Sequence, residues 1–277
     1  MKPLGYRTTP LALTESVLER RGCPIHYWLG GPADRPLLVL MHGATVDHRM
    51  FNPQVEDLIG AYRILVWDAR GHGKSQPIGE GFDLITCAED MLAILDAVGV
   101  EQAIIGGQST GGLIAQHLYR IAPKRVQAAL IIDSTPIAKA YPKTEVLMVK
   151  ATMPLFRIWP YRHYLKTAAT AVGLKPETRE YALAAMSQID RKDFLNIWQG
   201  VARSIDDQGI PGFVFAVPLL LIHGDADKSG TIARDMPEWA KWEPHATYAV
   251  IPHAAHNANQ DNPEVTNQII RDFLATL

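Results

Sequence analysis

The segment Gly107-Gln108-Ser109-Thr110-Gly111 constrains the fold most, because a strand pattern precedes it and a helix pattern follows it. Residues 103–105 form a short, branched, apolar run typical of a buried strand, and apolar residues then recur at helical spacing from 113 to 121. Small residues around Ser109 let strand and helix approach closely, and the tight turn lifts the serine hydroxyl out of the sheet. The pattern predicts a nucleophilic serine; the alternative is a glycine-rich turn that the serine only caps.

Short apolar runs alternate with helical patterns along much of the chain. The expected strands are residues 16–21 and 25–29 (a hairpin joined through Gly22), 37–41, 64–67, 103–105, 129–132, 219–222 and 248–251; the expected helices include 83–98, 109–122 and 262–274. Strands that alternate with helices favour a parallel sheet with helices on both faces. We therefore expect an α/β fold with a mostly parallel, doubly wound, eight-stranded sheet.

This alternation breaks between residues 136 and 211, where no strand pattern occurs. Methionine, aromatic and basic residues are frequent there, and prolines divide the segment into short helices. It is too long for a simple connection and too patterned for disorder. We expect residues 1–135 and 212–277 to form the core and residues 136–211 to form an inserted helical lid, part of which faces the site.

A serine nucleophile needs a base, and the base needs an orienting carboxylate. Asp227 follows the strand run 219–222, and His256 follows the run 248–251. Functional groups gather beyond the carboxyl ends of parallel strands, so both can meet Ser109. Asp133, which follows the run 129–132, is the alternative acid, although a carboxylate that caps a turn also fits its place.

Besides the serine motif, four segments resemble the α/β-hydrolase fold superfamily nearly end to end. They are His42-Gly43-Ala44, the D-x-R-G-x-G-x-S loop at 68–75, the G-x-x-D segment at 224–227, and Ile251-Pro252 leading to Ala254-Ala255-His256. The chain is most similar to the serine-nucleophile, carboxylesterase-like branch. Two departures concern loop shape: Ala255 stands where a glycine often precedes the histidine, and no proline follows Asp227 at the usual distance.

The resemblance implies roles for five residues. Ser109 would be the nucleophile, His256 the base and Asp227 the orienting acid. The backbone N–H groups of Thr110 and Ala44 would form the oxyanion hole. The site would hold no metal.

The resemblance also implies a reaction: hydrolysis of a small, apolar carboxylic ester or related acyl compound through an acyl-enzyme, without a cofactor. Lactonase, carbon–carbon bond hydrolase and cofactor-free perhydrolase share the triad and stay open. So does a hydrolase-fold small-ligand receptor with little turnover. A serine at 109 disfavours the dehalogenase and epoxide-hydrolase branches, which use aspartate as the nucleophile.

Other polar residues near these motifs allow competing interpretations. Gly73-Lys74-Ser75 is similar to the end of a phosphate-binding loop, but Asp68 occupies the place of that loop's first glycine. We expect Asp68 and Arg70 to form an internal ion pair. His42 is expected to brace its loop, and His48 to face either the pocket or solvent.

Four further residues, His223, Asp225, His253 and His256, could be imagined as metal ligands. A triad with supporting contacts explains the same groups better.

Composition sets limits on partners. The net charge of −2 over 277 residues gives no electrostatic footprint for nucleic acid or an anionic membrane. No run approaches the ~20 apolar residues of a membrane span, and the first residues lack a signal-peptide pattern. Two cysteines, Cys23 and Cys87, make no disulfide framework, and Cys87 shares a helical face with apolar residues of the core. We expect a cytoplasmic protein of undetermined oligomeric state.

Overall fold

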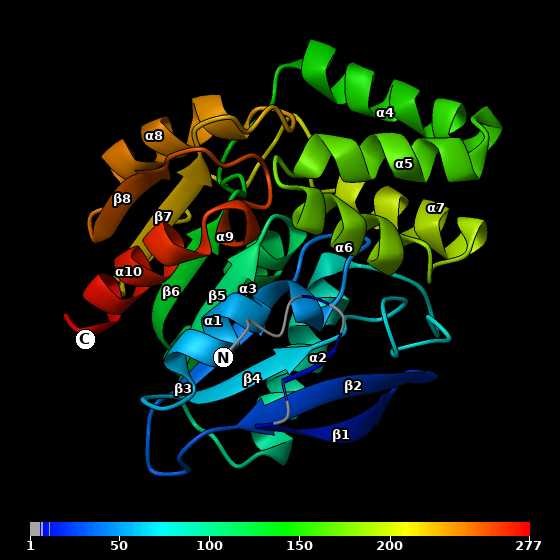
Figure 1. The fold of residues 1–277 in the computed structure, drawn as a ribbon. Coiled ribbons are helices and arrows are strands. Elements are labelled where there is room, and N and C mark those ends of the chain that lie inside the picture. Colours follow the sequence, from blue (N-terminus) through cyan, green and yellow to red (C-terminus); the bar gives the residue numbers. More distant parts are fainter. Residues whose placement is uncertain (1–5, 7, 11) are drawn as a thin grey trace.

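The computed structural model describes residues 6, 8–10 and 12–277. Its eight strands form one sheet in the order β1-β2-β4-β3-β5-β6-β7-β8 (Figure 1). The strands are β1 (Leu13–Arg20), β2 (Cys23–Gly30), β3 (Leu37–Met41), β4 (Arg63–Trp67), β5 (Ala103–Gln108), β6 (Val126–Ile132), β7 (Leu219–Gly224) and β8 (Ala246–Ile251). Pairing is antiparallel from β1 to β2 and from β2 to β4, and parallel from there to β8.

Helices cover both faces of the sheet. They are α1 (Asn52–Leu58), α2 (Leu84–Ala97), α3 (Thr110–Ile121), α4 (Lys143–Ile158), α5 (Tyr161–Val172), α6 (Pro176–Met186), α7 (Arg191–Ala202), α8 (Ile232–Trp242), α9 (Ala258–Asp261) and α10 (Pro263–Leu274), with short 3₁₀ turns η1 (His48–Phe51) and η2 (Pro123–Arg125). Apolar side chains of α2, α3 and α8 pack on one face, and those of α1 and α10 on the other. The expected mostly parallel, doubly wound sheet is confirmed.

The central strands are apolar on both faces because helices cover both. β3 and β5 are buried along their whole length, as the unbroken apolar run of β3 predicts. All eight expected strands and all three expected helices are present, with ends that differ by at most three residues. The sequence patterns predicted neither α1 nor α8.

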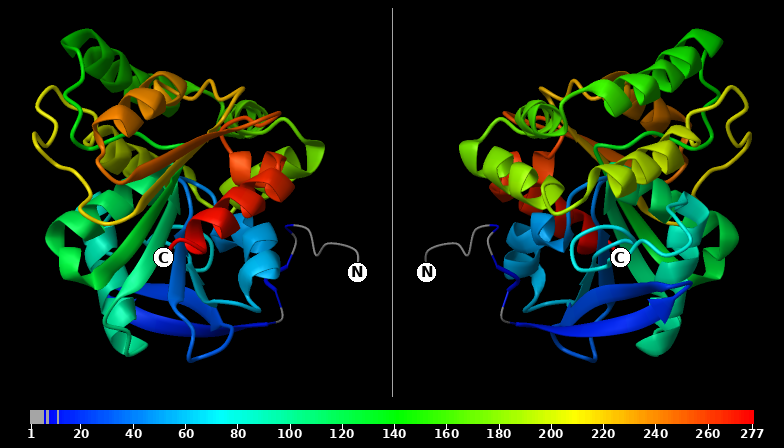
Figure 2. Two further views of the ribbon diagram at one scale, coloured as in Figure 1. Left: turned by 90° about the vertical axis from the view of Figure 1, so that its left-hand side faces the viewer. Right: turned by 90° about the vertical axis from the view of Figure 1, so that its right-hand side faces the viewer.

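The segment between β6 and β7 contains α4, α5, α6 and α7 and no strand. Figures 1 and 2 show these helices grouped at the opposite end of the molecule from the β1–β2 hairpin. Strands β5, β6 and β7 direct their carboxyl ends toward this group (Figure 1). None of the helices in the described residues is long and apolar enough to cross a membrane.

Candidate active site

The turn between β5 and α3 holds Ser109 in a conformation that few residues adopt. Its φ is 52°, in the left-handed region, and α3 begins at the next residue. A Cβ atom on Gly107 would lie 2.2 Å from the Gly111 carbonyl oxygen, and one on Gly111 would lie 1.9 Å from the Met41 carbonyl oxygen. The two glycines are therefore required for helix, strand and turn to meet this closely.

The structure brings Ser109, His256 and Asp227 together at the carboxyl ends of β5, β8 and β7. Nε2 of His256 lies 3.0 Å from Oγ of Ser109, and Nδ1 of the same ring lies 3.1 Å from Oδ2 of Asp227. The imidazole side chain is 12% exposed and the carboxylate side chain is fully buried. A continuous hydrogen-bonded chain therefore runs from the buried acid to the serine hydroxyl.

Asp227 stays ionised in this setting. Burial alone would raise its pKa, but the charge and hydrogen bond of His256 outweigh that effect and lower the pKa below the ordinary aspartate value. The backbone N–H of Ser229 also donates to Oδ1 at 2.7 Å. An ionised, oriented carboxylate fixes one tautomer of the ring, with Nδ1 protonated and Nε2 free to accept a proton.

Asp133, the alternative acid, is fully buried, and no hydrogen bond joins its carboxylate to the His256 ring. Its carboxylate accepts hydrogen bonds from the N–H groups of Gly224 at 2.9 Å and Ala258 at 3.1 Å. Burial, and then the charge of Asp227, raise the pKa of Asp133 well above its usual range. The side chain thus braces the loops that carry Asp227 and His256, and Asp227 is the carboxylate that contacts the histidine.

Two positioning residues were missed by the sequence analysis. Gln108 donates from Nε2 to the His256 carbonyl oxygen at 2.7 Å. Asp261, which is 1% exposed, accepts from the N–H of Ala255 at 2.9 Å and from the N–H groups of Leu174 and Lys175 at the start of α6. Gln108 occupies a variable place inside the serine motif, and Asp261 precedes a helix cap, so neither gives a signal without its partners.

The two expected oxyanion donors lie on both sides of the serine. Thr110 directly follows Ser109, and a Cβ on Gly43, the residue before Ala44, would lie 3.3 Å from the Ser109 Cβ. Within the described residues, the N–H groups of Thr110 and Ala44 have no hydrogen-bond acceptor. Both are therefore free to bind an oxygen that approaches the serine.

The expected ion pair between Asp68 and Arg70 is wrong. The carboxylate of Asp68 accepts hydrogen bonds from the backbone N–H groups of His48 and Lys74, and it also bonds to Nδ1 of the His48 ring. Both of its oxygens therefore have partners other than Arg70. The guanidinium of Arg70 points instead to Asp90 of α2, at 2.6 Å, and both side chains are fully buried. The two side chains therefore have separate partners, His48 and Lys74 for Asp68 and Asp90 for Arg70.

The loop histidines have structural contacts. His42 accepts a hydrogen bond from the Ala69 N–H through Nε2, which confirms its expected bracing role, and burial lowers its pKa. His48 faces neither pocket nor solvent: it is 4% exposed and stacks on Trp28 at a centroid distance of 3.6 Å.

The four residues considered as metal ligands do not gather around one point. His223 bonds to the Tyr248 hydroxyl, His253 is exposed, and His256 is engaged with Ser109 and Asp227. Within the described residues, the one group with suitable ligand spacing is Asp47, His48 and Asp68. Its atoms already bond to Arg49, to one another and to Lys74, so the cluster holds itself together without an ion.

A cavity of about 380 Å³ opens in front of Ser109 and His256. Its other walls come from α3, α4, α7, α8 and the adjoining loops and are largely apolar: Leu113, Tyr141, Met148, Val149, Trp198, Val201, Ile205 and Ile232. Of the described residues that line the cavity, Glu145 is the one with a carboxylate. Both of its oxygens bind the guanidinium of Arg234, at 3.0 and 3.2 Å. The cavity therefore suits an uncharged, mainly apolar group next to the serine.

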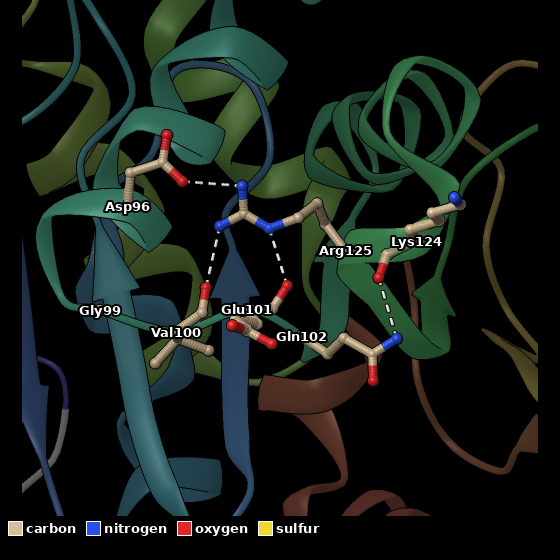
Figure 3. A pocket seen from close by; sticks show the side chains of 7 residues that line it. All are labelled: Asp96, Gly99, Val100, Glu101, Gln102, Lys124 and Arg125. Atoms are coloured by element: carbon tan, nitrogen blue, oxygen red, sulfur yellow. Dashed lines mark hydrogen bonds and ion pairs between the residues drawn. The ribbon is translucent and has the colours of Figure 1, made fainter.

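A second depression of about 650 Å³ lies at the amino-terminal end of β5 (Figure 3). Arg125 dominates it, and its guanidinium bonds to the carboxylate of Asp96 and to the carbonyl oxygens of Val100 and Glu101. Figure 3 shows these groups directed at one another rather than into open space. This depression lacks the reactive groups that the cavity at Ser109 contains.

Known proteins share this architecture over nearly the whole chain. The chain is 25% identical to 3-oxoadipate enol-lactonase 1 of Acinetobacter baylyi, over 94% of this chain and 97% of that protein. A hydrolase of Pseudomonas aeruginosa superposes with a TM-score of 0.82 at 23% identity, covering 96% of this chain and 99% of its own. A thermophilic esterase of Thermogutta terrifontis superposes with a TM-score of 0.81 at 21% identity, covering 95% and 98%. The profile of the alpha/beta hydrolase family matches residues 38–269, and the chain therefore belongs to that family.

Proposed function

We propose that this protein is a serine hydrolase that cleaves a small, predominantly apolar carboxylic ester through an acyl-enzyme. The observation that carries the proposal is the hydrogen-bonded chain from Asp227 through His256 to Ser109 on the wall of a largely apolar cavity. The helical segment of residues 136–211 would act as a lid, because α4 and α7 supply part of that wall. The similarity to an enol-lactonase, an esterase and another hydrolase supports hydrolysis in general.

The proposed reaction has two halves. Oγ of Ser109 attacks the ester carbonyl while His256 Nε2 takes the hydroxyl proton, and the Thr110 and Ala44 N–H groups bind the developing oxyanion. His256 returns the proton to the departing alcohol, which leaves the acyl group on the serine. Water then attacks the acyl-enzyme while His256 takes a proton from it, and His256 returns that proton to Oγ of Ser109 as the free acid departs. These steps draw on water and the groups of the chain itself.

A lactone is the second candidate substrate. It is a cyclic ester and undergoes the same chemistry, and the likeness to an enol-lactonase extends over 94% of this chain. Carbon–carbon bond hydrolysis and perhydrolysis use the same groups, and the geometry does not favour either.

A panel of p-nitrophenyl esters and simple lactones tests the proposal, with a fluorophosphonate that labels activated serines. We expect turnover of at least one ester or lactone, and peptide mapping should place the label on Ser109. Ser109→Ala should lose roughly 10⁶-fold in kcat while circular dichroism shows a folded protein. Label on another residue, or more than a few per cent of activity in Ser109→Ala, would overturn the assignment; labelling without turnover of any substrate would favour the receptor alternative.

A further inference from the structure

The outward side of α4 exposes large apolar side chains. Ile158, Met148 and Leu147 are 79%, 70% and 68% exposed, which makes them the most exposed large hydrophobic residues of the described chain. Leu155 on the same helix is 43% exposed. Figures 1 and 2 show α4 at one extremity of the molecule, with no other element outside it. Exposed apolar surface concentrated on one element indicates a binding surface.

Three of these side chains form an ordered stripe together with Ala151, which is also exposed. Leu147, Ala151, Leu155 and Ile158 are separated by four, four and three residues, so they lie on one side of the helix, which we call the outer face of α4. The opposite side packs inward, where the ring of Phe156 lies against the rings of Phe194 and Trp198. The helix is therefore apolar on two sides, and only the inner side has partners within the described chain.

A row of cations borders the outer face. Lys143, Lys150 and Arg157 repeat every seven residues, so they run along one edge of it. All three side chains are exposed, and none forms an ion pair with an acid of the described residues. Between residues 143 and 172 there are five lysines and arginines and a single acid, Glu145, which is bound to Arg234. The net charge of −2 for the whole chain conceals this local excess.

We propose that the outer face of α4 docks on the surface of a bilayer that contains anionic lipid, with the helix axis in the plane of the surface. An exposed apolar stripe enters the boundary between headgroups and acyl chains, while lysines and arginines along its edge meet anionic headgroups. A second copy of the chain fits this surface less well. A two-fold contact with the two α4 helices antiparallel would bring the same row of cations against itself, without acids to neutralise it.

Docking in this orientation brings the lipid surface next to the cavity. Met148 lies on α4 beside the outer face and also lines the cavity in front of Ser109. The next residue, Val149, lines the cavity as well. The proposal concerns binding only, so it does not depend on the proposed hydrolysis.

Co-sedimentation with lipid vesicles tests the charge requirement. We expect binding to vesicles of phosphatidylcholine and phosphatidylglycerol, little binding to phosphatidylcholine alone, and a loss of binding as salt rises from about 0.1 to about 0.5 M. The double variant Lys150→Glu, Arg157→Glu should bind at least about tenfold more weakly. Arg35→Glu, Lys124→Glu is the matched control, since both residues are exposed elsewhere on the surface, and it should bind like the parent. Equal losses in the two double variants, or equal binding to both vesicles, would overturn the proposal.

A fluorescent probe tests which face inserts. The native Cys23 and Cys87 are buried, so Ala151→Cys gives one accessible thiol for an environment-sensitive fluorophore. Its emission should shift to the blue with anionic vesicles and stay unchanged without them, and adding Leu147→Ser and Ile158→Ser should remove the shift. A blue shift that appears without vesicles and grows with protein concentration would assign the face to self-association instead. No shift with anionic vesicles would contradict docking through this face.

Discussion

Two buried carboxylates lie near His256, and their hydrogen bonds give them different tasks. Asp227 contacts the ring itself, whereas Asp133 holds the N–H groups of Gly224 and Ala258 on the loops around it. Their pKa values move in opposite directions, down for Asp227 and up for Asp133. Only Asp227 combines an ionised state with contact to the imidazole.

Amide replacements at these two positions separate the roles. Asp227→Asn should lower kcat near neutral pH by roughly 10⁴-fold, because an amide no longer fixes the productive tautomer of His256. Asp133→Asn should stay within about tenfold of the parent, because a neutral amide keeps one acceptor for the bracing N–H groups. Parallel kinetics on the two folded variants give the answer. A large loss at 133 with near-normal turnover at 227 would mean that Asp133 is the functional acid.

Sequence reasoning predicted the residues of the hydrogen-bonded chain better than the residues that support them. Ser109, Asp227 and His256 follow strand patterns, so their meeting could be predicted from the rule that strand ends converge. Asp261 could not be found in this way. Its partners are the backbone N–H groups of Leu174, Lys175 and Ala255. Every residue type except proline has such a group, so the identity of these residues gives no signal. The pairing of Asp68 was mispredicted for a related reason, since its partner His48 is twenty residues away in the chain.

At the scale of elements, α3 can approach β3 closely only because Gly111 has no side chain. Gly111→Ala should lower the free energy of unfolding by at least about 3 kcal/mol, or prevent folding, because the added Cβ would lie 1.9 Å from a backbone oxygen that cannot yield. Gly60→Ala is the matched control: nothing lies within 4 Å of its Cβ, and the change should stay within about 1 kcal/mol. Urea unfolding measures both changes in stability, with the dependence of free energy on urea concentration held the same for all the proteins compared. Equal stability of the two variants would show that the turn relaxes freely.

α4 and α7 line the cavity with apolar side chains, and this lining predicts a preference for apolar acyl groups. Each methylene that enters the apolar cavity should contribute about 0.8 kcal/mol, close to fourfold in kcat/KM, until the space is filled. A second, free carboxylate on the acyl chain should lower kcat/KM, because Glu145 and its partner Arg234 already neutralise each other. A series of p-nitrophenyl esters measures both trends. Equal or higher kcat/KM for the carboxylate-bearing ester would place an unrecognised cation in the cavity.

Patterns of hydrophobicity predicted the strands and several helices, but they did not predict which face of each helix is covered. The strand runs and the break in the alternation at 136–211 were visible in the chain, because they reflect burial on two faces or the absence of strands. The outer face of α4 was not visible, since an exposed stripe and a buried one have the same periodicity. Only packing shows which side of a helix has partners.

At the scale of the whole molecule, several buried histidines are held neutral, which makes stability depend on pH. Burial and then the charge of Arg120 lower the pKa of His117 to about 4, and burial and then the charge of His42 lower the pKa of His72 to about 3. Unfolded histidine takes up a proton near pH 6.5, so between that pH and the folded pKa the unfolded state binds more protons. Stability therefore rises with pH across this window and is fully present above it.

His117 offers the clearest test, because Nδ1 of its buried ring has no hydrogen-bond partner in the described chain. His117 alone should cost the parent roughly 2 kcal/mol of unfolding free energy as the pH falls from 6.5 to 5. His117→Leu removes that share, so its stability should fall less steeply with pH, while His72 and His42 keep a residual slope. His163→Leu changes an exposed histidine of α5 and should leave the slope unchanged. Urea unfolding at pH 7.5 and 5.0 compares the three proteins. Identical slopes for the parent and His117→Leu would contradict the lowered pKa, because they would mean that the His117 ring takes up its proton at the same pH in the folded and unfolded states.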